Sequence, residues 1–261
     1  MTALTDSLAE GAVQTVLEAG ELLADPAAVR SIRSKSETDY VTNVDLAVQK
    51  FLRERLAALA PDVQFMGEEQ DNSALDLTRP CWILDPVDGT TNLIHDFRNS
   101  AVSLGLCDKG EMICGVVYQP FSGEVFHAVR GEGACLNQKT IHVSSAVSMA
   151  ESLISIGTTP YEHEYADRNF EIFKKVFLDC QDIRRIGSAA IELCFVACGR
   201  LEAFFEMNLK PWDYAAGLLI IEEAGGSVTD FEGRKPQPWK RGNIVGSNGR
   251  LGQILVEQYM N

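Results

Sequence analysis

The sequence predicts an α/β protein with an antiparallel sheet in its first half and a mixed sheet in its second half. The chain has 261 residues, of which 46% are hydrophobic and 23% charged, so it can bury a large core. Strand-like runs between residues 101 and 143 are separated by closely spaced turns, which is typical of antiparallel hairpins. After residue 150, strand-like and helix-like segments alternate, as in α/β proteins.

Two amphipathic helices and two short strands are expected before the hairpins. Apolar residues recur at helical spacing in residues 4–23 and again in residues 44–59. Apolar runs at residues 63–66 and 81–84 indicate strands. The second of these strands is expected to stop just before Pro86, because proline cannot continue strand pairing.

The second half is expected to alternate strands and helices. Beginning with a strand and alternating, these elements cover residues 152–157, 165–178, 182–186, 188–197, 201–206, 218–224, 243–247 and 251–260. A domain boundary near residue 145 would divide the chain into halves 1–145 and 146–261. Since no Pro-, Gly- or Ser-rich linker marks this boundary, the two halves are expected to pack closely.

Composition and charge exclude several classes of protein. The 37 acidic and 23 basic residues give a net charge of −14, which opposes direct nucleic-acid binding. The same charge opposes an anionic substrate unless bound cations reverse the local sign. Seven cysteines without a Cys-x-x-Cys motif disfavour structural zinc or a disulfide framework. Neither a membrane span nor a secretory signal is recognisable, so we expect a cytoplasmic protein.

Residues 81–92 carry the strongest chemical signal in the chain. An apolar strand leads into Asp85, Asp88 and Gly89, and the next residues, Thr-Thr-Asn at 90–92, favour a helix start. Ligands collect at the carboxyl ends of strands and anions at helix starts, so carboxylates placed here would repel an anion unless a cation lay between them. This conflict predicts a divalent metal, with Mg2+ the usual partner of carboxylates and phosphates. Taken alone, Asp-Pro-Val-Asp-Gly would favour a plain turn over a metal site.

Several other polar motifs have a structural reading beside a functional one. Thr42 and Asp45 fit a helix cap, Glu68 fits a solvated surface acid, and Ser188 and Asp213 fit helix starts. The four histidines form no His-Glu-x-x-His motif, and no Gly-x-Ser-x-Gly motif occurs. The candidate catalytic and metal-binding groups are therefore carboxylates and hydroxyls, and such oxygen ligands select Mg2+ or Mn2+ over zinc.

The string Trp-Ile-Leu-Asp-Pro-Val-Asp-Gly-Thr-Thr-Asn at 82–92 closely resembles the metal-binding signature of the inositol monophosphatase family. Other family-like motifs occur in the family's order: Lys35 followed by Asp-Tyr-Val-Thr-Asn-Val-Asp (39–45), Gly-Glu-Glu (67–69), Arg-Arg-Ile-Gly-Ser-Ala-Ala (184–190) and Trp-Asp-Tyr-Ala-Ala-Gly (212–217). The resemblance implies an αβαβα layered sandwich of the sugar-phosphatase kind. The His-Asp-Phe-Arg segment (95–98) departs from the family, where Pro commonly replaces Arg98, and is expected to alter only the rim of the site.

The resemblance also implies a role for each motif. The implied metal ligands are Glu68, Asp85, the carbonyl of Val87, Asp88 and Asp213, and the implied catalytic groups are Glu68, Thr90 and Asp45. The implied substrate contacts are Gly89, Thr90, Thr91, Arg184, Ser188, Ala189, Glu206 and Asp213. By the same resemblance, two or three Mg2+ ions are expected per site, with Mn2+ as a substitute, and Asp45 holds waters of the additional ion. Lys35 would lie near the catalytic end, although the stretch after it is about one residue shorter than in some relatives.

The function implied is the hydrolysis of a phosphate monoester by a metal-activated water, with sensitivity to lithium. Inositol 1-phosphate is the leading substrate, and fructose 1,6-bisphosphate, NADP and histidinol phosphate are alternatives. The 3′-phosphoadenosine 5′-phosphate branch is disfavoured, because it usually has Lys where this chain has Thr91. A second class of function stays open, since some bacterial relatives act as regulators that bind transcription machinery. The resemblance also implies a homodimer, a small phosphorylated polyol or sugar as partner, and no membrane.

Overall fold

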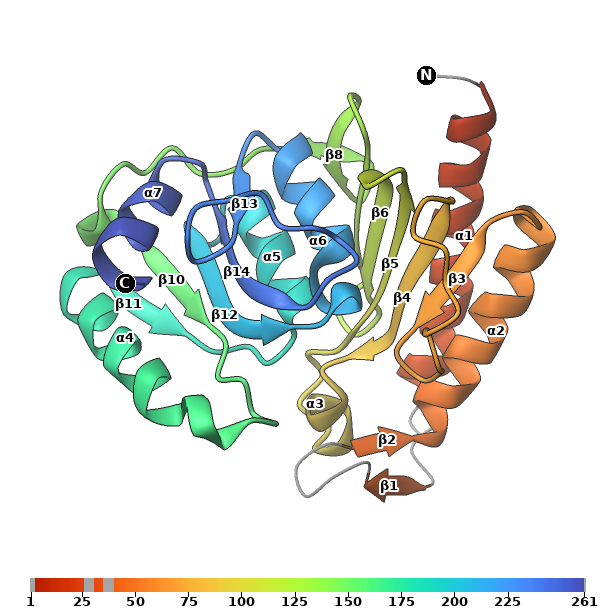
Figure 1. Ribbon diagram of the computed structural model, residues 1–261, viewed down its shortest axis with the longest axis horizontal. Helices are drawn as coiled ribbons and strands as arrows, with labels where there is room; N and C mark the ends of the chain where they lie inside the picture. Colours follow the sequence, from red (N-terminus) through yellow and green to blue (C-terminus); the bar gives the residue numbers. More distant parts are fainter. Residues whose placement is uncertain (1–2, 26–30, 35–39, 261) are drawn as a thin grey trace.

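The computed structural model of the chain describes residues 3–25, 31–34 and 40–260 (Figure 1). Lys35, which was expected near the catalytic end, lies outside these described residues. Within the described ranges, no helix is both long enough and apolar enough to cross a lipid bilayer.

Five layers of helices and sheets alternate across the structure (Figure 1). Helices α1 (Ala3–Ala24) and α2 (Asn43–Leu59) cover the outer face of a seven-stranded sheet. Helices α5 (Ala189–Ala197) and α6 (Pro211–Glu223) lie between this sheet and a five-stranded sheet. Helices α4 (Ala166–Asp179) and α7 (Leu251–Leu255) cover the far face of the second sheet. The predicted αβαβα sandwich is therefore confirmed.

The seven-stranded sheet is built from the first half of the chain and pairs its strands in sequence order. Its strands are β3 (Gln64–Gly67), β4 (Cys81–Asp88), β5 (Ala101–Asp108), β6 (Glu111–Gln119), β7 (Glu124–Val129), β8 (Gly133–Leu136) and β9 (Lys139–Ile141). The pairs from β4 to β9 are antiparallel, as the closely spaced turns predicted, whereas β3 runs parallel to β4. This one parallel pair becomes important at the site, because both strands end at the same edge of the sheet.

The five-stranded sheet is built from the second half of the chain and is mixed, as predicted. Its order is β11-β10-β12-β14-β13, with β11, β10 and β12 parallel and β14 antiparallel to both of its neighbours. The strands are β10 (Leu153–Ile156), β11 (Asp182–Arg184), β12 (Ala203–Leu209), β13 (Ser227–Thr229) and β14 (Gly242–Ser247). The division into domains at residue 145 stays a prediction.

Helix α6 is the centre of the protein. It packs against β4 to β8 of the first sheet, against β13 of the second, and against α5. Its residues from Tyr214 to Ile221 are all buried, which explains why this segment is apolar on every side rather than amphipathic. The two sheets therefore share one core layer, and burial of this layer joins the two halves of the chain.

Three features of the chain differ from the sequence-based expectation. Strand β4 continues through Pro86 to Asp88 instead of stopping before the proline. A register shift between Asp85 and Asp88 shows why: Pro86 lies in a bulge, where its missing N–H does not interrupt the ladder. A small sheet of β1 (Ile32–Ser34) and β2 (Tyr40–Thr42), and strand β13, are too short to give a recognisable sequence pattern.

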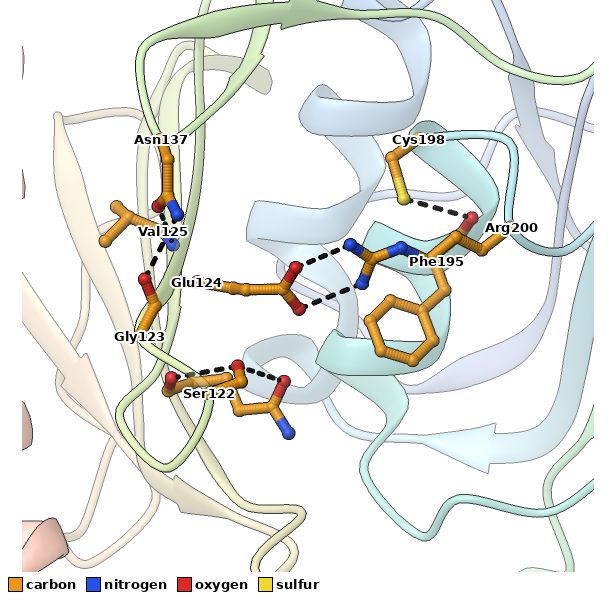
Figure 2. Close-up of polar contacts among 9 residues, drawn as sticks. Ser122, Gly123, Glu124, Val125, Asn137, Phe195, Cys198 and Arg200 are labelled. Atoms are coloured by element: carbon orange, nitrogen blue, oxygen red, sulfur yellow. Dashed lines mark hydrogen bonds and ion pairs between the residues drawn. The ribbon is translucent and has the colours of Figure 1, made fainter.

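Outside the core, an ion pair joins the two halves of the chain on the surface (Figure 2). Arg200, which follows α5, donates from Nη1 to Glu124 Oε2 at 2.9 Å and from Nη2 to Oε1 at 2.5 Å. Its guanidinium lies 4.8 Å from the centre of the Phe195 ring, and the hydrogen bonds from Arg200 lower the pKa of Glu124. The pair therefore fastens the end of α5 to strand β7.

Candidate active site

The parallel pair of strands brings the first two acids together. Gly67 at the end of β3 pairs with Leu84, and the amide of Glu68 donates to the Leu84 carbonyl at 3.3 Å. Glu68 therefore begins immediately beside Asp85, although 17 positions separate the two in the sequence. This meeting follows from the parallel direction of β3 and β4, because parallel strands end at the same edge.

The bulge in β4 brings Asp88 to the same place as Asp85. Asp85 lies opposite Ser103 and Asp88 lies opposite Ala101. Between these two pairs β4 advances by three residues and β5 by only two. In a regular strand, side chains three positions apart point to opposite faces. One inserted residue restores the same face, and both carboxylates therefore line one pocket.

Asp213 reaches this pocket from the first turn of α6. Its Oδ2 accepts a hydrogen bond from the amide of Lys210 at 2.7 Å, so it also caps the helix. The structural role and the predicted ligand role are thus compatible, because the cap engages only one oxygen.

Burial and like charge act on these acids together. Burial raises the pKa of Asp85 well above its ordinary value, and the charges of Glu68, Asp88 and Asp213 raise it further. Burial likewise raises the pKa of Asp213, with Asp88 and Glu68 adding to the effect. The pKa of Asp88 rises to about 6, mainly through burial, although Ser188 and Ala190 oppose the shift with hydrogen bonds. A divalent cation would relieve this repulsion.

The donor set fits such a cation. Asp88 Oδ2 accepts from Ser188 Oγ at 2.5 Å and from the Ala190 amide at 2.7 Å, and Asp85 Oδ1 accepts from the Val87 amide at 2.9 Å. These hydrogen bonds orient the carboxylates while engaging one oxygen of each, which leaves the other for a metal. Across residues 3–25, 31–34 and 40–260, no three acids, histidines or cysteines lie close enough together to form a complete set of metal ligands.

A buried hydrogen-bonded pair lies directly behind the carboxylates. The Thr90 hydroxyl lies 3.0 Å from Asp45 Oδ1 and 3.0 Å from the Val87 carbonyl, either of which can accept its proton. Asp45 Oδ2 accepts from the amide and hydroxyl of Thr42, at 2.9 and 2.5 Å, and completes the predicted capping box of α2. Burial raises the pKa of Asp45, and its three hydrogen-bond donors oppose the rise. Asp45 is therefore both a helix cap and the partner of Thr90.

A single pocket of about 440 Å³ collects most of the predicted residues. Ten of them line it: Glu68, Asp85, Val87, Asp88, Gly89, Thr90, Thr91, Ala189, Glu206 and Asp213. Asp45 and Ser188 lie behind the lining and contact Thr90 and Asp88 respectively. The short helix α3 (Thr90–Ile94), which lies just above β1 and β2 in Figure 1, contributes Thr90, Thr91 and Asn92 to the pocket lining. Gly89 begins it with φ +89°, where a Cβ would come within 2.9 Å of the Asn99 carbonyl.

Arg184 is the predicted contact that the structure does not bring to the pocket. Its guanidinium pairs with Asp182 at 2.5 Å on the surface, and its side chain is 48% exposed. Arg185 lines the pocket instead and was not predicted. Arg184 is the last residue of β11 and shares a face of that strand with Asp182, whereas Arg185 follows the strand and is not held to that face. The only sequence signal for Arg185 was its position next to Arg184 in the same motif.

The wall opposite Asp85 and Asp88 carries the predicted Glu206 and further residues that the sequence did not identify. Glu206 Oε1 accepts from the Thr159 amide at 2.8 Å, and burial raises the pKa of Glu206 while Arg185 lowers it. Gly157 permits this arrangement, because a Cβ there would lie 2.1 Å from the Glu206 carboxyl carbon. The unpredicted lining residues include Phe97, Tyr161, Arg185, Lys210, Trp212 and Arg241.

Known proteins resemble this chain in both sequence and fold. The model of the inositol monophosphatase family matches residues 4–260. The Salmonella typhimurium protein named Nus factor SuhB is 38% identical over 249 residues, covering 94% of this chain and 92% of that protein. An inositol-1-monophosphatase of Rhizobium meliloti is 36% identical over 248 residues, covering 94% and 93%. The crystal structure of the extragenic suppressor protein suhB from Bartonella henselae superposes with a TM-score of 0.90 at 32% identity, covering 97% and 98%.

Proposed function

The chain belongs to the inositol monophosphatase family, and from this membership we propose that it is an Mg2+-dependent phosphatase that converts inositol 1-phosphate to inositol and phosphate. One observation supports the proposal above the others. Carboxylates from the end of β3, from β4 and from α6 line a single pocket, and their charges raise the pKa values of Asp85 and Asp213. Buried acids that repel one another in this way are suited to a divalent cation.

The metal would be held by oxygen atoms alone. Such ligands suit Mg2+, with Mn2+ as a substitute, and we propose two or three ions. Bound Mg2+ would supply positive charge to the phosphoryl group and favour ionisation of the attacking water. Lithium is expected to inhibit by replacing one of the ions. The ligands we assign are Glu68, Asp85, the carbonyl of Val87, Asp88 and Asp213.

Thr90 and Asp45 form the proposed route for the proton of the attacking water. As the Thr90 hydroxyl accepts the proton of the water, it can pass its own proton to Asp45, which is already within hydrogen-bonding distance. The raised pKa of buried Asp45 makes its carboxylate a better acceptor for that proton. Glu68 would orient the same water from the other side. Because water is the nucleophile, no phosphoenzyme is formed.

Substrate contacts divide between the two walls of the pocket. The backbone amides of Gly89 to Thr91 would donate to phosphate oxygens. On the opposite wall, Glu206 would accept from hydroxyls of the polyol, and Arg185 takes the place first assigned to Arg184. The remaining contacts we propose are Ala189 and Asp213, with Ser188 acting behind them through its hydrogen bond to Asp88.

A turnover panel tests this proposal directly. Purified protein with saturating Mg2+ is assayed for phosphate release from inositol 1-phosphate, fructose 1,6-bisphosphate, NADP, histidinol phosphate and 3′-phosphoadenosine 5′-phosphate. We expect inositol 1-phosphate to have the highest kcat/KM by about tenfold or more. If another phosphate in the panel has the highest kcat/KM, that compound replaces inositol 1-phosphate as the proposed substrate, and the proposed metal-dependent hydrolysis stays the same. If no phosphate in the panel is hydrolysed with either Mg2+ or Mn2+, the phosphatase proposal fails.

A regulatory role is the second candidate, because a relative that is 38% identical is named a Nus factor. The net charge of −14 would suit a basic protein partner. A pure binding module would show no metal-dependent turnover, so the same panel separates the two functions, although one protein could have both. The proposed homodimer is tested by sedimentation.

A further inference from the structure

A buried carboxyl group lies behind the pocket wall and has no part in the reaction proposed above. Glu192 belongs to α5 and is only 1% exposed. Its Oε1 accepts hydrogen bonds from the Ile186 amide at 2.9 Å and from Ser155 Oγ at 2.8 Å. Its Oε2 is also buried and has no hydrogen-bond partner in the part of the chain that the structure describes.

An acid at this position is unexpected from packing alone. Every other residue of α5 is apolar, and a leucine would satisfy the helix face as well. Burial raises the pKa of Glu192 to about 8, with Arg185 lowering it and Glu206 raising it. Both of these neighbours line the pocket. Burying a carboxyl group costs free energy, so such a group is expected to make specific polar contacts. The two groups that donate to Glu192 show where those contacts act.

The segment that Glu192 holds is the pocket wall formed by residues 185–187. Asn92 of α3 donates through Nδ2 to the carbonyls of Ile186 and Gly187, at 2.9 and 3.2 Å. Glu192 of α5 accepts from the amide of Ile186. Side chains from two helices therefore bind the amide and the carbonyl of Ile186, so each limits the movement that the other would allow.

The position of Arg185 depends on these hydrogen bonds to Ile186 and Gly187. Its Nε and Nη2 donate to Thr158 Oγ1 at 3.3 and 3.2 Å, which are long hydrogen bonds at an exposed site. Such bonds hold a long side chain only weakly, and the backbone on either side must supply the remaining restraint.

We propose that Glu192 is a positioning residue for substrate binding: by holding the Ile186 amide and the Ser155 hydroxyl, it fixes the wall that places Arg185 against the substrate's leaving group. This inference rests on the proposed function, in which that wall binds the polyol. Asp88 is bound by Ser188 and Ala190 at the start of the same helix, through hydrogen bonds that do not involve the Glu192 side chain. Loss of Glu192 should therefore weaken substrate binding while the chemical step persists.

Two substitutions at one position separate anchoring from packing. Glu192→Leu keeps a similar volume and removes the acceptor, so KM for inositol 1-phosphate should rise about tenfold, as expected for losing hydrogen bonds to a buried carboxyl group. The value of kcat should stay within about threefold, because the loss is of binding shared by substrate and transition state. Glu192→Gln retains a carbonyl acceptor and should recover most of the affinity.

Glu202, which directly precedes β12, offers a matched control because it also accepts a hydrogen bond from strand β10. It is 9% exposed and accepts from the Leu153 amide at 2.6 Å, at the end of β10 away from the pocket. Glu202→Leu should lower thermal stability as Glu192→Leu does, yet leave KM unchanged. An equal rise in KM for both variants would reduce Glu192 to a general stabiliser of the sheet, and an unchanged KM in Glu192→Leu would overturn the proposal.

Hydrogen exchange gives a readout that needs no turnover. The Ile186 amide should exchange at least about tenfold faster in Glu192→Leu than in wild type, and return toward wild type in Glu192→Gln. If Glu192→Leu does not fold, Ser155→Ala and Glu192→Gln carry the same comparison. A protein that hydrolyses no phosphate but shows this exchange pattern would refute the proposed function and keep the anchor, whereas normal turnover with an unchanged Ile186 amide in Glu192→Leu would refute the anchor alone.

Discussion

The two walls of the pocket are built in different ways. The carboxylate wall takes most of its residues from the continuous segment 85–91, and hydrogen bonds such as Val87 N to Asp85 are local. The opposite wall is gathered from three distant segments, around residues 159–162, 185–189 and 206–210. Its contacts are long-range, as between Thr159 and Glu206 or between Asn92 and Ile186.

This difference indicates a division of labour. A contiguous motif can specify much of its own geometry, so the carboxylate wall depends on distant segments mainly for Glu68 and Asp213 and for the hydrogen bonds from Ser188 and Ala190 to Asp88. The opposite wall depends on how α5, β10 and β12 meet, so small packing changes there alter which leaving group fits. Substitutions in the first wall should therefore affect kcat, and substitutions in the second should affect KM.

The largest expected effect is at Asp88. Asp88→Asn keeps an acceptor for Ser188 and Ala190 but removes one negative charge from the proposed metal site. The value of kcat should fall by about 10² to 10³ or more, since charge stabilisation of the phosphoryl group is lost. Circular dichroism should show an intact fold, with Tm within about 3 °C of wild type. Wild-type turnover at saturating Mg2+ would contradict the assignment of Asp88 as a ligand.

An intermediate effect is expected at Arg185, with Arg184 as its adjacent control. Arg185→Ala removes a cation from the pocket lining and should raise KM for inositol 1-phosphate by about tenfold, with little change in kcat. Arg184→Ala removes a side chain that is 48% exposed and paired with Asp182, so KM should change by less than about twofold. Steady-state kinetics on both variants show which arginine contacts the substrate. A larger rise in KM for Arg184→Ala than for Arg185→Ala would restore Arg184 as the contact.

The smallest expected effect concerns the join between the halves at Glu124 and Arg200 (Figure 2). Arg200→Gln should lower the free energy of unfolding by about 0.5–1 kcal/mol at pH 7, a value reduced by solvent because the Arg200 side chain is 42% exposed. Arg200 lowers the pKa of Glu124, so the stabilisation is present above the unfolded pKa of about 4.3 and is lost as the pH falls through the folded pKa.

Urea unfolding at pH 7 and below pH 4 measures that prediction. The difference between wild type and Arg200→Gln should shrink at the lower pH. Arg98→Gln serves as a control, because its pair with Asp96 is 68% and 76% exposed and should contribute nothing measurable. A constant difference across the pH range would mean that Arg200 acts through its contact with Phe195 rather than through Glu124.

The elements that were predicted correctly are those whose pattern is local. Helices α1 and α2 follow apolar spacing, and the capping box of Thr42 and Asp45 marks the start of α2 as predicted. The hairpin strands from β5 to β9 follow their turns. The continuation of β4 past Pro86 was missed, because a bulge depends on the neighbouring strand rather than on the proline.

The sequence by itself determined the alternation of strands and helices in the second half, the acids of residues 85–88 and the cap at Asp45, since each depends on residues a few positions apart. Only the tertiary structure decided that Glu68 meets Asp85, that Arg185 rather than Arg184 lines the pocket, and that Glu192 lies behind it. These depend on strand direction, on the face to which a side chain points, and on the depth of burial. All three are set by contacts between segments far apart in the chain, which no local pattern records.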